Sequence, residues 1–204
     1  MRADPTDEEL MVRFQRDDRT AFAFLVRRHK VRLYNFVLRH LRNASAAEEV
    51  VQDAFVRVAQ GAADFRHAAR FSTWLYTIAR NLCVDHARKG ALRRHPSLDE
   101  PGHTTDGDAF DRSELGEHTA DARANVERSA ISGEIRERVL AALYKLPDDQ
   151  REVFLMREIS SLPFRDIAEI VGAPENTVKS RMRYALEHLQ EALSDFEEYA
   201  RALR

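Results

Sequence analysis

Apolar positions recur at helical spacing through most of the first 95 residues. Leu10 and Phe14 lie one helical turn apart. Ahead of them, Thr6 and Glu9 have the spacing of a capping box, in which two side chains satisfy free backbone N–H groups at the start of a helix. A long amphipathic pattern then runs from Phe22 to Leu41. The chain is therefore predicted to begin with a short helix followed by a long one.

The same periodicity predicts two further helices before residue 95. Ser45 and Glu48 repeat the capping-box spacing ahead of an apolar stripe. That stripe consists of Val51, Ala54, Phe55 and Val58. After a predicted loop over residues 61–70, Ser72 can cap a helix with an inward face formed by Leu75, Ile78 and Leu82. Together these helices predict a compact bundle over residues 1–95.

Helical spacing lapses over residues 96–131, where glycine and proline stand among Asp, Glu, Ser and Thr, a composition typical of a flexible linker. It returns from residue 132 in a helix that ends at Pro147 and carries Ile135, Val139, Leu143 and Leu146. Asp149 with Glu152 can cap the next helix, which carries Val153, Phe154 and Ile159. The predicted fold class is all-α: two small helical bundles, over residues 1–95 and 132–204, joined by a flexible acidic linker.

The second bundle contains the pattern of a helix-turn-helix over residues 161–184. Gly172 suits the left-handed position after a helix, Pro174 cannot continue that helix, and Thr177 can cap the next one. An inward stripe follows, formed by Val178, Met182, Ala185 and Leu189. The outward positions are Lys179, Ser180 and Arg183, with Arg181 at the flank. This face is typical of major-groove binding, although a helical hairpin with a solvated basic face has the same pattern.

The charge of the chain is distributed unevenly. Its 204 residues carry a net charge of −2, but residues 1–96 hold 18 Arg and Lys against 11 Asp and Glu, a net +7. Residues 97–128 hold 3 against 9, a net −6, and residues 129–204 hold 11 against 14, a net −3. A basic front and an acidic middle favour two different kinds of partner surface.

Composition and motifs also exclude several classes of protein. One cysteine, Cys83, allows neither an internal disulfide nor a multi-thiolate metal site, and the eight histidines lack metal-type spacing. No paired-carboxylate or nucleophile–base signature indicates an enzyme, so we expect no catalytic residue, metal or cofactor. No apolar run reaches the roughly 20 residues that span a bilayer, and no signal peptide begins the chain. A soluble, cytoplasmic protein is expected.

One face of the helix predicted after Ser72 has the chemistry of a single-strand binding surface. Its residues are Trp74, Thr77, Asn81, Asp85 and Arg88. An aromatic ring can stack on an unpaired base, and amide or basic groups can read a base edge. The preceding loop could line a pocket for an extruded base with Phe65, Arg66, His67 and Arg70. Aromatic residues are commonly buried, and Trp74 and Tyr76 fit the alternative that they are ordinary core residues.

An acidic face is predicted on the helix before that loop. It consists of Glu48, Glu49, Gln52 and Asp53, opposite the apolar stripe of the same helix. Such a face can dock a basic partner helix, because complementary charge sets register and association rate. It can also simply be solvated.

Three segments together resemble the extracytoplasmic-function (ECF) sigma factors of bacterial RNA polymerase, over nearly the whole chain. Ala46–Val58 resembles the polymerase-binding helix, and Phe71–Asn81 resembles the promoter-melting segment that runs into the −10 reader. Residues 146–181, with the helix-turn-helix, resemble the −35 reading domain. Tyr184 and Leu186 stand where many members carry arginine, which implies fewer phosphate contacts or a different base preference at −35.

The resemblance implies a role for each surface. Core polymerase, through the clamp helices of its largest subunit, would bind Glu48, Glu49, Gln52 and Asp53. The −10 strand would be recognised and held open by Arg66, His67, Arg70, Phe71, Trp74, Asn81, Asp85, His86 and Arg88. The −35 element would be read by Thr177, Lys179, Ser180, Arg181, Arg183 and Tyr184. An anti-sigma factor is a further expected partner, and the linker would mimic a nucleic-acid strand in the polymerase channels.

Two other functions remain open at this point. The first is a helix-turn-helix transcriptional regulator with a sensing or dimerising front bundle, which would bind duplex DNA tightly without polymerase. The second is a helical adaptor with a solvated basic helix, which would not bind DNA at all.

Overall fold

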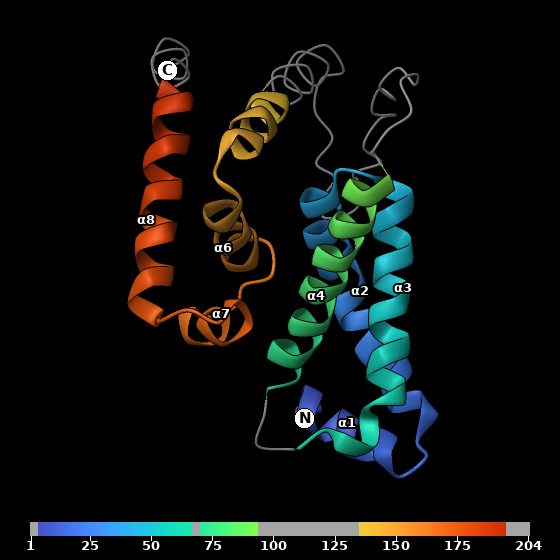
Figure 1. Cartoon of the computed structure of the whole chain (residues 1–204). Coiled ribbons are helices and arrows are strands. Elements are labelled where there is room, and N and C mark those ends of the chain that lie inside the picture. The colour runs from blue at the N-terminus through green and yellow to red at the C-terminus, as the bar shows by residue number, and fades with distance from the viewer. Residues whose placement is uncertain (1–3, 67–69, 94–134, 195–204) are drawn as a thin grey trace, which may run out of the picture. The chain divides into compact units, whose positions relative to one another are not determined.

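A computed structural model describes residues 4–66, 70–93 and 135–194 of the chain (Figure 1). Every regular element in these ranges is helical, which confirms the all-α prediction. The predicted linker over residues 96–131 and the last ten residues lie outside the described residues. The proposed boundaries between the two bundles therefore stay predictions.

The front of the chain forms a bundle of four α-helices and one short 3-10 helix. Their bounds are α1 Asp7–Gln15, α2 Arg19–Leu41, α3 Ala44–Gln60, η1 Ala62–Asp64 and α4 Phe71–Arg93. Helices α2, α3 and α4 pack along one another, and α1 packs against α2 and α4 near one end of the bundle (Figure 1). Each of these helices buries one face, as its apolar spacing predicts. Buried core residues include Leu10, Leu25, Leu33, Phe36, Val37, Val51, Ala54, Phe55, Val58, Phe71, Leu75 and Leu82. Ile78, also predicted to face inward, is half-buried.

The first predicted helix start is confirmed. Thr6 Oγ1 accepts from the Glu9 N–H at 3.2 Å, and the Glu9 carboxylate accepts from the Thr6 N–H at 2.9 Å, which completes the capping box of α1. Asp18 caps α2 by accepting from the backbone of Thr20 and Ala21. Both caps satisfy amides that have no partner inside their helix.

The other predicted helix starts are wrong in detail. Helix α3 begins at Ala44 and is capped by Asn43 rather than by Ser45 with Glu48, and Asn43 accepts from Ala46 N–H at 2.8 Å. The chain reaches this cap through Arg42, whose left-handed conformation ends α2 and turns the backbone. Asparagine is as good a cap as serine, so the earlier of two candidates starts the helix.

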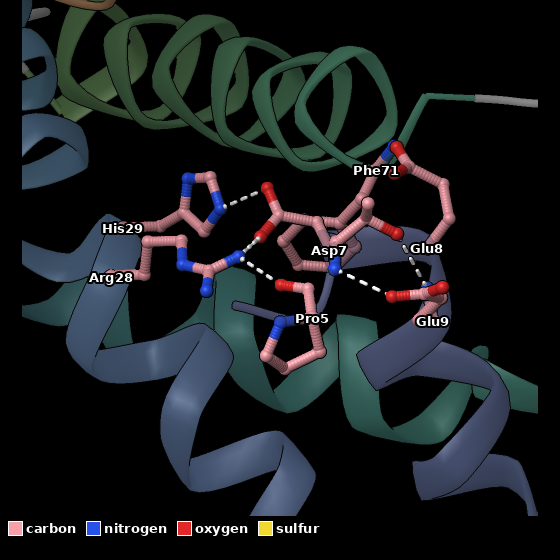
Figure 2. A network of polar contacts seen from close by, with 8 residues as sticks. Pro5, Asp7, Glu8, Glu9, Arg28, His29 and Phe71 are labelled. Atoms are coloured by element: carbon pink, nitrogen blue, oxygen red, sulfur yellow. Dashed lines mark hydrogen bonds and ion pairs between the residues drawn. The ribbon is translucent and has the colours of Figure 1, made fainter. Parts of the chain in front are cut away.

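Helix α4 begins one residue before the predicted cap, Ser72, and its first amide is satisfied from elsewhere in the chain. The Glu8 carboxylate of α1 accepts a hydrogen bond from the Phe71 N–H at 3.0 Å (Figure 2). Asp7, the residue before Glu8, pairs with two residues of α2: with Arg28 at 2.5 Å and with His29 at 2.7 Å. The first turn of α1 therefore contacts two other helices of the bundle.

The C-terminal part is also helical, over residues 135–145, α6 Asp148–Glu158, α7 Phe164–Val171 and α8 Glu175–Ala192. In the first of these helices Leu143 is buried, whereas Ile135, predicted to be inward, is 40 % exposed. Helix α6 starts at Asp148, so Asp149 and Glu152 lie inside it and do not form the predicted cap. Val153 is buried, and Phe154 and Ile159 are half-buried.

Candidate polymerase and nucleic-acid interfaces

The turn between α7 and α8 has the geometry that the sequence predicts. Gly172 ends α7 with φ 68° and ψ 35°, a left-handed conformation that glycine adopts without steric cost. Ala173 N–H donates to the Ala168 carbonyl at 3.1 Å across the turn. Helix α8 then begins at Glu175, so Thr177 lies inside the helix and the prediction that it is the cap is wrong. Pro174 supplies the first carbonyl instead, which accepts from Val178 N–H at 3.1 Å.

Helix α8 has one buried and one exposed face. The predicted inward stripe is confirmed, since Val178, Met182, Ala185 and Leu189 are all buried. The opposite side exposes Thr177, Lys179, Ser180, Arg183 and Tyr184, with Arg181 half-buried at the flank. Polar and basic side chains therefore share the solvent side of the helix that follows the turn. This arrangement suits contact with phosphates and base edges.

Two cations of this face pair with carboxylates on the same helix. Lys179 Nζ lies 2.6 Å from Glu175, and Arg183 Nε lies 3.6 Å from Glu187, each pair one helical turn apart. The Arg183 guanidinium also lies over the Tyr184 ring, 4.8 Å from its centroid. Tyr184 therefore holds the guanidinium plane by a cation–π contact, a role that the sequence did not suggest.

The predicted −10 residues of α4 fall into two groups. Asn81, Asp85 and Arg88 are exposed, and His86 is half-buried. Phe71, in contrast, is completely buried, and its ring forms edge contacts with Phe65 and Trp74. Phe71 is therefore a core residue, and Tyr76 is buried as its core alternative predicts.

Trp74 lies between these two groups. Its ring is half-buried and packs 5.2 Å from the Phe65 ring. It also lies over Gly61 at the end of α3, where an added Cβ would come within 3.3 Å of the indole. A glycine thus lets the indole approach the backbone closely, and the remaining exposed part of the ring is the only part that a base could reach.

The loop before α4 is described only at its two ends. Arg66 and Arg70 are both exposed. His67, the third polar residue predicted there, lies outside the described residues.

The predicted acidic face on α3 is present. Glu48, Glu49, Gln52 and Asp53 are all exposed, opposite the buried stripe of Val51, Ala54, Phe55 and Val58. A groove between α3 and α4 begins at this face. Its polar walls carry Glu49, Asp53 and Arg57 from α3 and Asp85, His86 and Lys89 from α4, so both signs of charge line it.

Local sequence spacing does not predict this groove, because it forms only where α3 pairs with α4 in the tertiary structure. The groove places Asp85 beside the acidic face, whereas its helical spacing and the family resemblance predict a place for it on the −10 surface.

The single cysteine of the chain, Cys83, is buried. Burial raises the pKa of the Cys83 thiol to about 12, with a further contribution from the negative charge of Glu152, so Cys83 stays protonated at neutral pH. Among the described residues, no group of three His, Cys, Asp or Glu side chains could hold a metal ion. None of the described helices combines the length and apolar character required to cross a bilayer.

Two separate parts of the chain match known protein families. Residues 25–93 match Sigma-70 region 2, and residues 136–189 match Sigma-70, region 4. The first match contains the acidic face and the exposed residues of α4, and the second contains the helix-turn-helix.

Whole-chain relatives are similar over nearly their full length. The chain is 32 % identical to the RNA polymerase sigma-H factor of Pseudomonas aeruginosa, over 92 % of this chain and 93 % of the relative. It is 31 % identical to the ECF RNA polymerase sigma factor SigW of Bacillus subtilis, over 89 % and 93 %. The ECF RNA polymerase sigma-E factor of Escherichia coli is 32 % identical, over 89 % and 91 %.

Solved structures share the fold at lower sequence identity. CnrH, solved in complex with the cytosolic domain of CnrY, superposes with a TM-score of 0.64 at 23 % identity, covering 94 % of this chain and 99 % of that one. The sigma factor RpoE of Bartonella quintana, solved with the anti-sigma factor NepR, gives a TM-score of 0.62 at 22 % identity, covering 85 % and 96 %.

Proposed function

This chain belongs to the sigma-70 family, in its extracytoplasmic-function group, and from that premise we propose that it binds core RNA polymerase, recognises −35 and −10 promoter elements and promotes opening of the −10 element. The observation that carries the proposal is the exposed basic face of α8 directly after a helix-turn-helix turn, within the region 4 match. The acidic face of α3 and the polar side of α4 lie within the region 2 match.

At −35, α8 enters the major groove with Lys179, Ser180 and Arg183 toward the DNA. Arg183 is the strongest candidate for a base contact, because its guanidinium can donate two parallel hydrogen bonds to guanine. Tyr184 restrains the guanidinium and so reduces the entropy lost when it binds. Thr177 and Arg181, at the start and the flank of the same face, contact the DNA backbone.

At −10, the exposed side of α4 holds an opened strand. Asn81 and Arg88 offer amide and guanidinium groups to unpaired bases, and Arg66 and Arg70 offer positive charge at the loop ends. Trp74 offers the exposed part of its ring for stacking. Strand separation is then offset by the capture of unstacked bases, with no covalent step.

The acidic face docks core polymerase. Four side chains, Glu48, Glu49, Gln52 and Asp53, present negative charge and hydrogen-bond acceptors without apolar groups between them. Basic residues on the clamp helices of the largest subunit complement this surface. The −6 linker, outside the described residues, follows the basic channels of the enzyme.

The partners and location follow from the same assignment. Two structural neighbours were solved with partner proteins, one of them named an anti-sigma factor. We propose an anti-sigma factor for this chain too, and a cytoplasmic location, where core polymerase works.

Run-off transcription tests the proposal directly. Purified core polymerase is given a pool of genomic promoter fragments with and without the chain, and the new transcripts are sequenced. We expect a set of start sites that appears only with the chain and that shares −35 and −10 elements. Identical transcript sets in both reactions would refute the assignment.

Asp53→Arg tests the polymerase-binding surface. The substitution reverses a charge at an exposed position, so it should leave the fold intact and weaken core affinity, by about 1.5 kcal/mol or more if a close charge pair is lost. Pull-down and titration against core give the measurement. Asp64→Arg, at an exposed acidic residue of η1, is the matched control and should bind core normally. An equal loss of core affinity in both variants would show that the acidic face is not the binding surface.

A further inference from the structure

Helix α1 contacts the backbone at both ends of the segment that leads into α4. At one end, Gln15 Nε2 donates to the Ala62 carbonyl at 2.7 Å and to the Phe65 carbonyl at 2.9 Å. At the other end, the Glu8 carboxylate accepts from the Phe71 N–H at 3.0 Å (Figure 2). Glu8 and Gln15 are seven residues apart, about two helical turns, so both lie on the same face of α1.

The contact at Phe71 is electrostatically favourable. The first amides of a helix have no partner within it and carry partial positive charge, which a carboxylate stabilises. Glu8 thus replaces the local cap that the sequence predicts at Ser72. The Phe71 side chain is held as well, with its ring 5.2 Å from the His29 ring and 6.3 Å from the Phe65 ring.

Helix α1 is itself fixed to the bundle, so it can act as a support. Asp7 pairs with Arg28 at 2.5 Å and with His29 at 2.7 Å, and Arg28 also donates to the Pro5 carbonyl at 3.1 Å. Leu10 and Met11 of α1 are completely buried. The helix therefore offers a fixed spacing between Glu8 and Gln15.

We propose that α1 is a brace that positions the two ends of the loop before α4, at Phe65 and at Phe71, with Glu8 and Gln15 as its two positioning residues. Arg66 directly follows Phe65 and Arg70 directly precedes Phe71, so the brace fixes the backbone beside each of these two cations before DNA arrives. Neither Glu8 nor Gln15 contacts DNA. The effect of the brace on promoter opening rests on the proposed function. The hydrogen bonds by which α1 holds the two ends of the loop do not depend on it.

Hydrogen exchange of the full chain tests the structural part without any promoter. Glu8→Ala should increase exchange of the Phe71 amide about tenfold, the effect of losing a hydrogen bond to a charged group. Glu8→Gln retains an acceptor and should restore most of the protection. Glu9→Gln removes charge from the same turn while keeping the acceptor of its capping box, and should leave Phe71 unaffected. Unchanged exchange at Phe71 in Glu8→Ala would overturn the brace.

Promoter opening tests the functional part in the assembled holoenzyme, on a promoter that the wild-type chain uses. Glu8→Ala and Gln15→Ala should each slow open-complex formation about tenfold, with core affinity unchanged. The double variant should be little slower than either single variant, because both side chains act on one segment. Gln60→Ala, at an exposed glutamine at the end of α3, is the matched control for Gln15.

The outcomes separate the two hypotheses. If both variants open the promoter at the wild-type rate while Phe71 exchange rises, the contacts are merely structural and the positioning role is refuted. If the wild-type holoenzyme initiates nowhere, the proposed function fails, and the exchange result alone decides whether the brace exists.

Discussion

Asp18 illustrates how a single carboxylate can make helix formation depend on pH. It caps α2 through the backbone of Thr20 and Ala21 and pairs with Arg13 at 2.7 Å. Hydrogen bonds from the Thr20 hydroxyl, Arg13 and the Ala21 N–H lower the pKa of Asp18 to about 2, outweighing a smaller opposing effect of burial. The carboxylate is therefore charged in the folded protein at pH values where an unfolded aspartate would already bind a proton.

This lowered pKa predicts a defined loss of stability in acid. Because the folded pKa lies below the unfolded value of 3.8, the contribution of Asp18 is present above pH 3.8 and is lost as the pH falls toward 2. Asp18→Asn keeps a good capping group but cannot titrate. Urea unfolding should show the wild type more stable than Asp18→Asn at pH 6, with the difference vanishing near pH 2. A difference that does not depend on pH would contradict the prediction.

Arg183 carries the residue-scale prediction for DNA recognition. Arg183→Ala should weaken −35-dependent transcription, by about 1–3 kcal/mol if the guanidinium contacts a base edge. The measurement is the initiation rate on a promoter with and without its −35 element. Gln190→Ala, exposed further along α8, is the control and should have no effect. Wild-type output from the −35-dependent promoter would reject Arg183 as a base contact.

Helix α8 as an element presents cations that are already paired. Exposed ion pairs of this kind contribute only about 0.2–1 kcal/mol, so DNA phosphates can displace the carboxylates readily. Glu175 and Glu187 nevertheless oppose DNA binding, because each must be separated from its cation and left near a phosphate.

Glu187→Gln should therefore tighten binding of the holoenzyme to −35 DNA. We expect a gain of up to about 1 kcal/mol at low salt, smaller as ionic strength rises, since the removed charge is exposed. Electrophoretic or anisotropy titration at two salt concentrations measures it. Glu191→Gln, one turn further along α8, should change the affinity less; an equal effect of both substitutions would indicate a general charge effect.

The elements were largely predictable from the sequence, whereas most of their starting points were not. The apolar stripes of α3 and α8 are buried, as their periodicity predicts, because a helix in a small bundle must cover its apolar face. Thr6 and Glu9 form the predicted box, since both partners lie in one turn. Helix α4 is capped by Glu8, 63 positions away, and a distant carboxylate has no local signature.

In the candidate surfaces, too, the features set by local helical spacing were predictable and those set by tertiary contacts were not. Exposure of the α8 cations and of the acidic face follows directly from helical spacing. Phe71 was predicted to be a −10 residue from its place in the sequence motif. That motif does not indicate that the Phe71 ring is buried against Phe65. The Asp85 position in the groove depends on how α3 and α4 pair, and the Arg183–Tyr184 contact depends on side-chain conformation.

At the scale of the whole molecule, the net charge of −2 conceals basic and acidic stretches. Residues 129–204, which contain the helix-turn-helix, carry a net charge of −3, so we expect few phosphate contacts between this part of the free chain and duplex DNA, and further contacts supplied by polymerase. We expect the two matched regions to act together, one at each promoter element.

The free chain should accordingly bind duplex promoter DNA weakly, in the micromolar range or above at physiological salt, which is typical of non-specific binding. The holoenzyme should bind the same DNA at least a hundredfold more tightly, within the range that separates specific from non-specific complexes. Fluorescence anisotropy of one labelled promoter fragment measures both. Nanomolar binding by the free chain would favour a self-sufficient transcriptional regulator instead.

The attachment of α1 to α4 bears on how sigma factors can be recombined. The region 2 match starts at residue 25, well after α1 ends at Gln15. A chimera joined at that boundary would have a foreign α1, or none, beside α4. The Phe71 N–H could then lose the carboxylate of Glu8 that accepts its hydrogen bond. Exchange of promoter specificity between relatives should therefore succeed more often when residues 4–93 are transplanted as one block.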